Sequence, residues 1–99
     1  MNRYHRSKID SNHPEIVQAF RALGWYILST APLKAACDLM VIKNGRVIAV
    51  EVKDGSLSPS KRKLSEGEAK FRQNWLANGG EWLLITSVDD VLTLPSGEY

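Results

Sequence analysis

Several features that carry chemistry in other proteins are missing from this sequence. It has one cysteine, Cys37, which excludes an internal disulfide and a zinc site built from several cysteines. No apolar run approaches the ~18 residues of a membrane span, and the first residues lack the apolar stretch of a signal peptide, so we expect a cytoplasmic protein. There is no glycine-rich phosphate loop, no Cys/His cluster and no internal repeat. Cys37 itself is expected to be a small core residue.

Basic residues are concentrated in one part of the chain. The 99 residues carry a net charge of +2, but all thirteen Lys and Arg lie within residues 1–72, where seven acids leave +6. Residues 73–99 hold four acids and no base, which gives −4. The length corresponds to one small domain with a single core. The uneven charge favours a polyanionic partner.

The stretch from Asp38 to Lys53 predicts a β-hairpin. Asn44-Gly45 lies between two alternating apolar runs, and a type I′ turn needs a positive φ at both central residues. A two-residue turn there pairs residues whose numbers sum to 89, so Asp38 lies opposite Glu51. Because side chains alternate between the faces of a sheet, Lys53 shares the face of both acids, and the other face is wholly apolar.

The two opposed carboxylates repel each other, and something must offset that repulsion. A shared proton, the neighbouring Lys53 or a hard divalent cation with oxygen ligands would each do so. The cation explains most, because it accounts for both acids, for the ammonium beside them and for their place at the open end of the hairpin. The spacing is equally compatible with an edge hairpin whose acids fray into solvent beside a surface ion pair.

The rest of the chain predicts two longer helices, two further strands and a short last helix. Asn12 and Glu15 have the spacing of a capping box before a helix over residues 13–23, and Ser65 and Glu68 repeat it before a second helix. Each glutamate has two interpretations, a helix cap or a carboxylate aimed at the Asp38/Glu51 site. The strands are expected at residues 25–29, 38–43, 46–53 and 82–86, and the last helix begins at Ser87.

Two basic segments and Lys34 are candidates for contact with phosphates. Residues 1–9 are expected to form a flexible basic arm, and the polar loop that follows Lys53 leads directly into three consecutive cations. Such contacts position a nucleic acid and do not read its sequence. The residues assigned to nucleic-acid binding are Arg3, Arg6, Lys8, Lys34, Lys61, Arg62 and Lys63.

The order of helix, three strands, helix, strand and small helix resembles the PD-(D/E)XK nuclease superfamily, with Asp38 opening the second strand and Glu51-Val52-Lys53 closing the third. It is most similar to the small stand-alone VRR-NUC group, the virus-type replication-repair nucleases. The similarity runs from Asp10 to about Leu94 and includes Asn12-His-Pro-Glu-Ile-Val17, Glu51-Val-Lys-Asp-Gly55, Pro59-Ser-Lys-Arg62, and Leu64-Ser65 followed by Glu68, Phe71 and Trp75. Cys37 departs from the family pattern, which has proline before the aspartate, but that position carries no ligand.

This resemblance implies a single α/β domain over residues 10–94, of order αβββαβ(α), with a mixed central sheet flanked by helices and a tail over residues 95–99. It implies a Mg²⁺- or Mn²⁺-dependent deoxyribonuclease in which Asp38 and Glu51 bind the metal with the Val52 carbonyl. Lys53 orients the attacking water and stabilises charge on the phosphate, and Glu15 matches the family's additional acidic residue near the metal.

The resemblance also implies a partner and an assembly. Members of this family are often homodimers that act on branched or junction DNA such as Holliday junctions, and a phage or bacterial enzyme of this kind acts in the host cytoplasm. The alternative is a nucleic-acid-binding module of the same fold that does not cut. Cleavage assays with Mn²⁺ and with EDTA discriminate the two.

Overall fold

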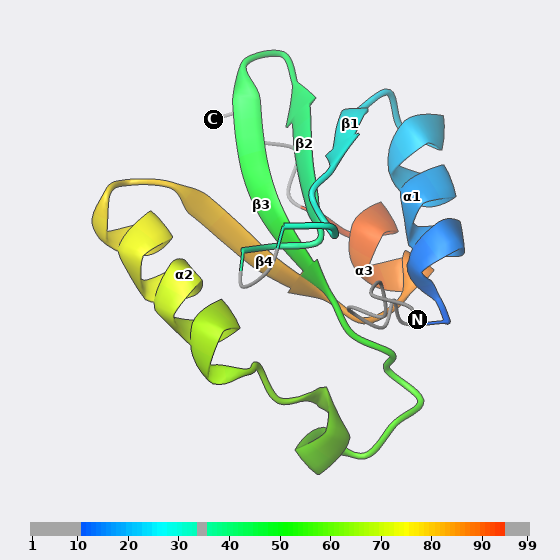
Figure 1. Ribbon diagram of the computed structural model, residues 1–99. Helices are drawn as coiled ribbons and strands as arrows, with labels where there is room; N and C mark the ends of the chain where they lie inside the picture. Colours follow the sequence, from blue (N-terminus) through cyan, green and yellow to red (C-terminus); the bar gives the residue numbers. More distant parts are fainter. Residues whose placement is uncertain (1–10, 34–35, 95–99) are drawn as a thin grey trace.

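A computed structural model describes residues 11–33 and 36–94, and its elements follow the predicted order (Figure 1). The elements are α1 (His13–Ala22), β1 (Tyr26–Ser29), β2 (Leu39–Lys43), β3 (Arg46–Val52), the 3₁₀ helix η1 (Pro59–Arg62), α2 (Glu66–Ala77), β4 (Glu81–Ile85) and α3 (Val88–Leu92). The helix η1 was not expected, because the sequence there predicts only a polar loop. Among the described residues, no helix has the length and apolar character needed to span a bilayer.

The four strands form one mixed sheet of order β1-β2-β3-β4. The pairs β1/β2 and β2/β3 are antiparallel, and β3/β4 is parallel. A parallel pair needs a long crossover connection, which the segment containing η1 and α2 supplies. The predicted α/β class with a mixed sheet is therefore confirmed.

The hairpin has the predicted register. Cα partners run from Lys43 opposite Arg46 to Leu39 opposite Val50, so each pair sums to 89. Asn44 and Gly45 have φ values of 51° and 84°, as a type I′ turn requires. The paired ladder ends at Leu39 and Val50, so the predicted pairing of Asp38 with Glu51 is not part of it, but both acids lie at the same end of the hairpin.

The apolar face of the hairpin forms the centre of the core. Leu39, Val41 and Val50 are at most 1% exposed, and they pack with Ile16 and Phe20 of α1. The helices α1 and α3 lie against this face, and the two helices also contact each other (Figure 1). Cys37 is buried beside this core, as expected. The acids lie on the opposite side of the sheet from these two helices.

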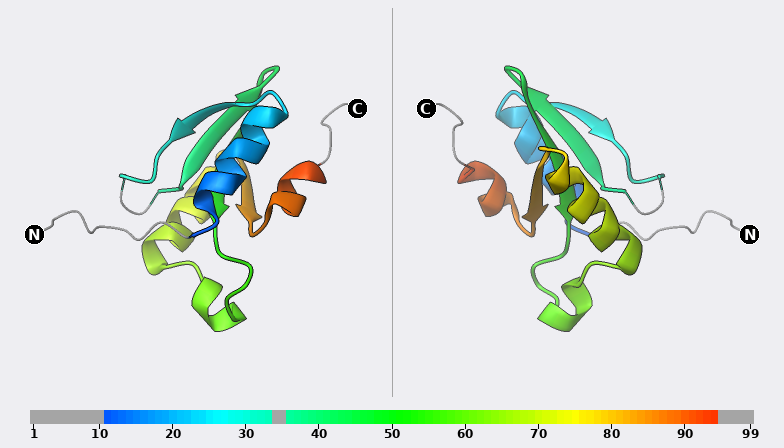
Figure 2. Two further views of the ribbon diagram at one scale, coloured as in Figure 1. Left: turned by 90° about the vertical axis from the view of Figure 1, so that its right-hand side faces the viewer. Right: turned by 90° about the vertical axis from the view of Figure 1, so that its left-hand side faces the viewer.

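Among the described helices, α2 alone covers part of that second face, beside β4 (Figure 2). The Trp75 indole Nε1 donates to the Glu81 carbonyl at 2.8 Å, and a Cβ at Gly80 would collide with the Trp75 ring. Toward β1 the same face stays open. Four apolar side chains are exposed there, namely Tyr26 (74%), Leu28 (58%), Ile42 (41%) and Val47 (40%).

Candidate active site

Asp38 lies just before β2 and is attached to β3 by both its backbone and its side chain. Its N–H donates to the Val50 carbonyl at 3.0 Å, and its Oδ2 accepts a hydrogen bond from the Val52 N–H at 2.8 Å. A continued ladder would direct the Val52 N–H at the carbonyl of Cys37, but that carbonyl accepts from the Thr30 hydroxyl at 2.7 Å. The Asp38 carboxylate therefore accepts the hydrogen bond that a backbone carbonyl would accept in a continued ladder. This bond holds it at the end of the hairpin.

Glu51 is the buried acid of the site, with 2% of its surface exposed. Burial, the negative charges of Asp38 and Glu68, and a hydrogen bond with Glu68 raise the pKa of Glu51 to about 9, although Lys53 acts in the opposite direction. The carboxyl of Glu51 consequently carries a proton at neutral pH when no cation is bound. Protonation of Glu51 is therefore one way in which the repulsion between the two acids is offset.

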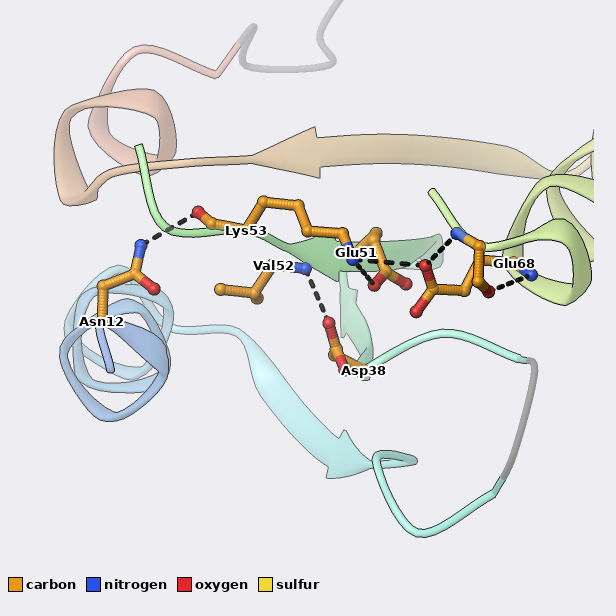
Figure 3. Close-up of polar contacts among 7 residues, drawn as sticks. Asn12, Asp38, Glu51, Val52, Lys53 and Glu68 are labelled. Carbon is orange, nitrogen blue, oxygen red and sulfur yellow. Dashed lines mark hydrogen bonds and ion pairs between the residues drawn. The ribbon is translucent and has the colours of Figure 1, made fainter. Parts of the chain in front are cut away.

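Lys53 lies between two glutamates (Figure 3). Its Nζ is 3.6 Å from Glu51 Oε2 and 3.2 Å from Glu68 Oε1, and its side chain is 16% exposed. The ammonium is largely removed from water, so its ion pair with Glu68 acts with little solvent screening. The three predicted residues Asp38, Glu51 and Lys53 are thus brought together at one end of the hairpin.

Glu68 caps α2 and also contacts Lys53, so it is both a helix cap and a neighbour of the site. Its Oε1 accepts from the Ser65 N–H at 2.8 Å, and its own N–H donates to the Ser65 hydroxyl at 3.1 Å, which completes the predicted capping box. Burial raises the pKa of Glu68, but the hydrogen bonds from Ser65 and Glu51 and the charge of Lys53 outweigh it and hold that pKa below its usual range. Glu68 is therefore the ionised member of the carboxyl pair.

The capping box predicted for α1 is wrong. Asn12 occupies the N-cap position but makes no side-chain cap hydrogen bond, because its amide donates instead to the carbonyls of Lys53 and Thr86. Glu15 is exposed in the first turn of α1, and no contact within the described part of the chain joins it to Asp38, Glu51 or Lys53. Its assignment as an additional acid of the site stays a prediction.

The basic residues after β3 are partly accessible. Lys61 and Lys63 are exposed in and just after η1, whereas the Arg62 Nε donates to the Leu57 carbonyl at 2.9 Å and helps to close this turn. The assigned residues Arg3, Arg6, Lys8 and Lys34 lie outside the described residues. Lys61 and Lys63 are therefore the assigned cations whose side chains reach solvent in the described chain.

The site offers oxygen donors to a metal, but in a small set. Within residues 11–33 and 36–94, no group of three or more His, Cys, Asp or Glu side chains is arranged to hold a metal ion. The candidate ligands are the carboxylates of Asp38 and Glu51, with the backbone of Val52 beside Asp38. Hard divalent cations take such oxygen ligands and complete their coordination with water.

One participant in the site was not assigned by the sequence. Asn12 contacts the main chain of Lys53 although it lies 41 residues earlier, so no local spacing predicts the contact. Glu68 was recognised as a candidate from its capping-box spacing, but its ion pair with Lys53 depends on how α2 packs on the sheet.

Comparison with known proteins gives one informative match. No protein-family model matches the sequence, and no curated protein matches it. A solved structure titled "VRR_NUC domain" matches with a TM-score of 0.62 and 23% sequence identity, over 87% of this chain and 96% of that one. The chain therefore has the fold of a VRR_NUC nuclease domain, and the resemblance found in its motifs is confirmed at the level of the fold.

Proposed function

We propose that this protein is a divalent-metal-dependent DNA endonuclease that hydrolyses phosphodiester bonds in branched or junction DNA. The observation that carries the proposal is that Asp38, Glu51 and Lys53 lie together at one end of the hairpin. The chain that contains this hairpin has the fold of a VRR_NUC domain. Two acids and one ammonium are the groups that a metal-assisted attack on a phosphodiester requires.

The donor set fits Mg²⁺ or Mn²⁺. Glu51 is a buried carboxyl whose ionisation is opposed by burial and by the charge of Asp38, and a cation between the two acids would remove that opposition. Asp38, Glu51 and the Val52 carbonyl are the groups that would hold it. A bound Mg²⁺ or Mn²⁺ polarises a phosphate oxygen and lowers the pKa of a water molecule.

Lys53 supplies positive charge where the negative charge of the phosphate grows during the reaction. Its ammonium is positioned by Glu51 and Glu68, so it needs little rearrangement to meet a phosphate beside Glu51. We assign to Lys53 the orientation of the attacking water and the stabilisation of the phosphate, and to Glu68 the positioning of Lys53. Glu15 is proposed as an additional acid, and it would have to approach from the first turn of α1.

DNA binding is assigned to the basic residues near this site. Lys61 and Lys63 are exposed between the end of β3 and the start of α2, the helix that delivers Glu68 to Lys53. A phosphate held there would lie along the approach to the acids. The cations of residues 1–9 and Lys34 would extend this surface, in keeping with the excess of positive charge in residues 1–72.

A homodimer is part of the proposal. A branched substrate has two strands to cut, and one domain offers one candidate site, so two copies would supply a site for each strand. The open part of the sheet supports it. Tyr26 lies opposite Ile42, which lies opposite Val47, so apolar side chains continue across three strands without a charged residue between them. Such a continuous apolar patch is typical of the core of a protein–protein interface.

The test is cleavage of a DNA panel by the wild type and by Asp38→Asn. Junction, flap, single-stranded and linear DNA are incubated with Mn²⁺ and with EDTA. We expect metal-dependent cutting of the branched substrates, and a loss of at least about hundredfold in Asp38→Asn with DNA binding retained or strengthened, because the variant loses a metal ligand but keeps the basic surface. Asp89→Asn removes an exposed acid from α3 and serves as the matched control.

Each outcome of this assay is informative. Undiminished cutting by Asp38→Asn would refute the assignment of the site. Mobility shifts that persist in every condition without any cleavage would favour a nucleic-acid-binding module of the same fold.

A further inference from the structure

The side chain of Asn12 connects three distant segments of the chain. Its Nδ2 donates to the carbonyl of Lys53 at 3.1 Å (Figure 3). It also donates to the carbonyl of Thr86 at 3.0 Å, so both amide hydrogens are used. Its Oδ1 is buried and accepts no hydrogen bond from any described residue. Helix capping does not explain this arrangement, because the amide points away from the N-terminus of α1.

The backbone of Lys53 is fixed from two sides. Its N–H donates to the Ile85 carbonyl at 3.0 Å, and its carbonyl accepts from Asn12. The regular strand β3 ends one residue earlier, at Val52. Asn12 therefore holds the first peptide beyond the strand, at the point where the chain would otherwise begin to turn away from the sheet.

The residues that follow Lys53 are held close to the Thr86 carbonyl. The N–H of Gly55 donates to the Thr86 carbonyl at 3.2 Å, and a Cβ at residue 55 would lie 2.8 Å from that oxygen. The Thr86 carbonyl thus accepts from both Gly55 and Asn12. The segment from Lys53 to Gly55 is fixed between α1 and the end of β4.

We propose that Asn12 is a positioning residue for Lys53, an inference that rests on the proposed nuclease function. The amide of Asn12 holds the Lys53 carbonyl, and with the Ile85 bond it fixes the backbone from which the side chain leaves toward Glu51 and Glu68. Loss of the amide lets the backbone of Lys53 shift away from the end of the sheet, and this shift moves the ammonium relative to the carboxyls. The effect is expected on the chemical step more than on DNA binding, because the Asn12 amide is bonded to the backbone carbonyls of Lys53 and Thr86 and to neither Lys61 nor Lys63.

The variant that tests this is Asn12→Ser. Serine is a favoured N-cap residue, so α1 keeps or gains a cap, but one hydroxyl cannot replace an amide that donates to two carbonyls. We expect kcat on the cleaved DNA to fall about tenfold or more, with KM changed less than about twofold, since small displacements of a reacting group have large effects on rate. Ser11→Ala is the matched control, because it removes the neighbouring bond to Asp54 Oδ2 and leaves the Lys53 carbonyl untouched.

A second measurement does not depend on cleavage. Amide hydrogen exchange at Lys53 and Gly55 is expected to accelerate about tenfold or more in Asn12→Ser, while exchange at Val50 is unchanged. Wild-type exchange together with wild-type kcat in this variant would overturn the proposal. If the wild type cuts no DNA, the nuclease assignment fails, and the exchange rates alone decide whether Asn12 fixes Lys53.

Discussion

Glu51 keeps a proton in the folded protein that the unfolded chain releases. Its pKa rises from 4.5 to about 9 because it is buried and because Asp38 and Glu68 are negatively charged. Between about pH 4.5 and 9 the folded state therefore binds more protons than the unfolded state, and the free energy of unfolding falls as pH rises through this window. Glu51 therefore lowers the stability of the metal-free protein at neutral pH.

Glu51→Gln should therefore stabilise the metal-free protein, and more so at high pH. Glutamine keeps the shape of the protonated acid and has no proton to lose. We expect its melting temperature in EDTA to exceed that of the wild type by about 5 °C or more at pH 8, and the difference to disappear near pH 5. Thermal melts across this range measure it, with the exposed Glu15→Gln as control. A difference that does not change with pH would contradict the proposed protonation of Glu51.

At the scale of elements, α2 contacts the molecule at its start, near its end and in its middle, where the Arg72 guanidinium lies 4.9 Å from the centre of the Trp82 ring. None of its residues is buried. Near its start, Glu68 pairs with Lys53 and closes the capping box with Ser65, and near its end the Trp75 indole donates to the Glu81 carbonyl. The first turn of α2 is consequently both a stability element and a wall of the site.

Two substitutions should separate these roles. Ser65→Ala removes the cap and should cost about 1 kcal/mol of stability while leaving the Glu68–Lys53 pair in place. Glu68→Gln can still accept from the Ser65 N–H but has no charge to offer the largely buried Lys53 ammonium, so we expect a loss of stability of at least about 1 kcal/mol together with a single-turnover cleavage rate lower by about tenfold. Chemical denaturation and single-turnover kinetics are the measurements. Equal effects of both variants on both quantities would show that Glu68 acts only as a cap.

The two capping boxes show what local sequence can predict. Ser65 and Glu68 form one because their contacts are with each other, and the Asn44-Gly45 turn fixes the hairpin register for the same reason. Asn12 and Glu15 have the same spacing but form none, because the Asn12 amide finds carbonyls at residues 53 and 86. The acids and Lys53 were thus predictable from counting along the hairpin, whereas the contacts that position Lys53 depend on how α1 and α2 pack.

For the molecule as a whole, the helices are distributed unequally over the sheet. The helices α1 and α3 cover one face, and α2 covers only the β4 side of the other (Figure 2). The period-2 pattern of the hairpin predicted which residues share each face, but it could not show that Tyr26, Leu28, Ile42 and Val47 would stay exposed. The candidate site and the open apolar surface are therefore on the same side of the sheet.

The proposed homodimer can be tested on this open surface with Leu28→Lys and Ile42→Lys. A lysine in the centre of an apolar interface would bury an unpaired charge, so we expect the dimer dissociation constant to rise about a hundredfold or more. Light scattering coupled to size exclusion should give twice the monomer mass for the wild type and the monomer mass for both variants. Leu92→Lys, at an exposed position of α3, should behave as the wild type.

The cleavage products test whether the two sites of a dimer cut the two strands of a junction. If two sites act on two strands of a junction, the monomeric variants should still nick one strand with Mn²⁺ but lose the paired cuts, because each retains Asp38, Glu51 and Lys53 without a second copy. Denaturing gels with each strand labelled in turn distinguish paired cuts from single nicks. A wild type that is monomeric at the concentrations of the assay and still makes paired cuts would contradict the dimer, and it would leave the candidate site as the basis of cleavage by one chain.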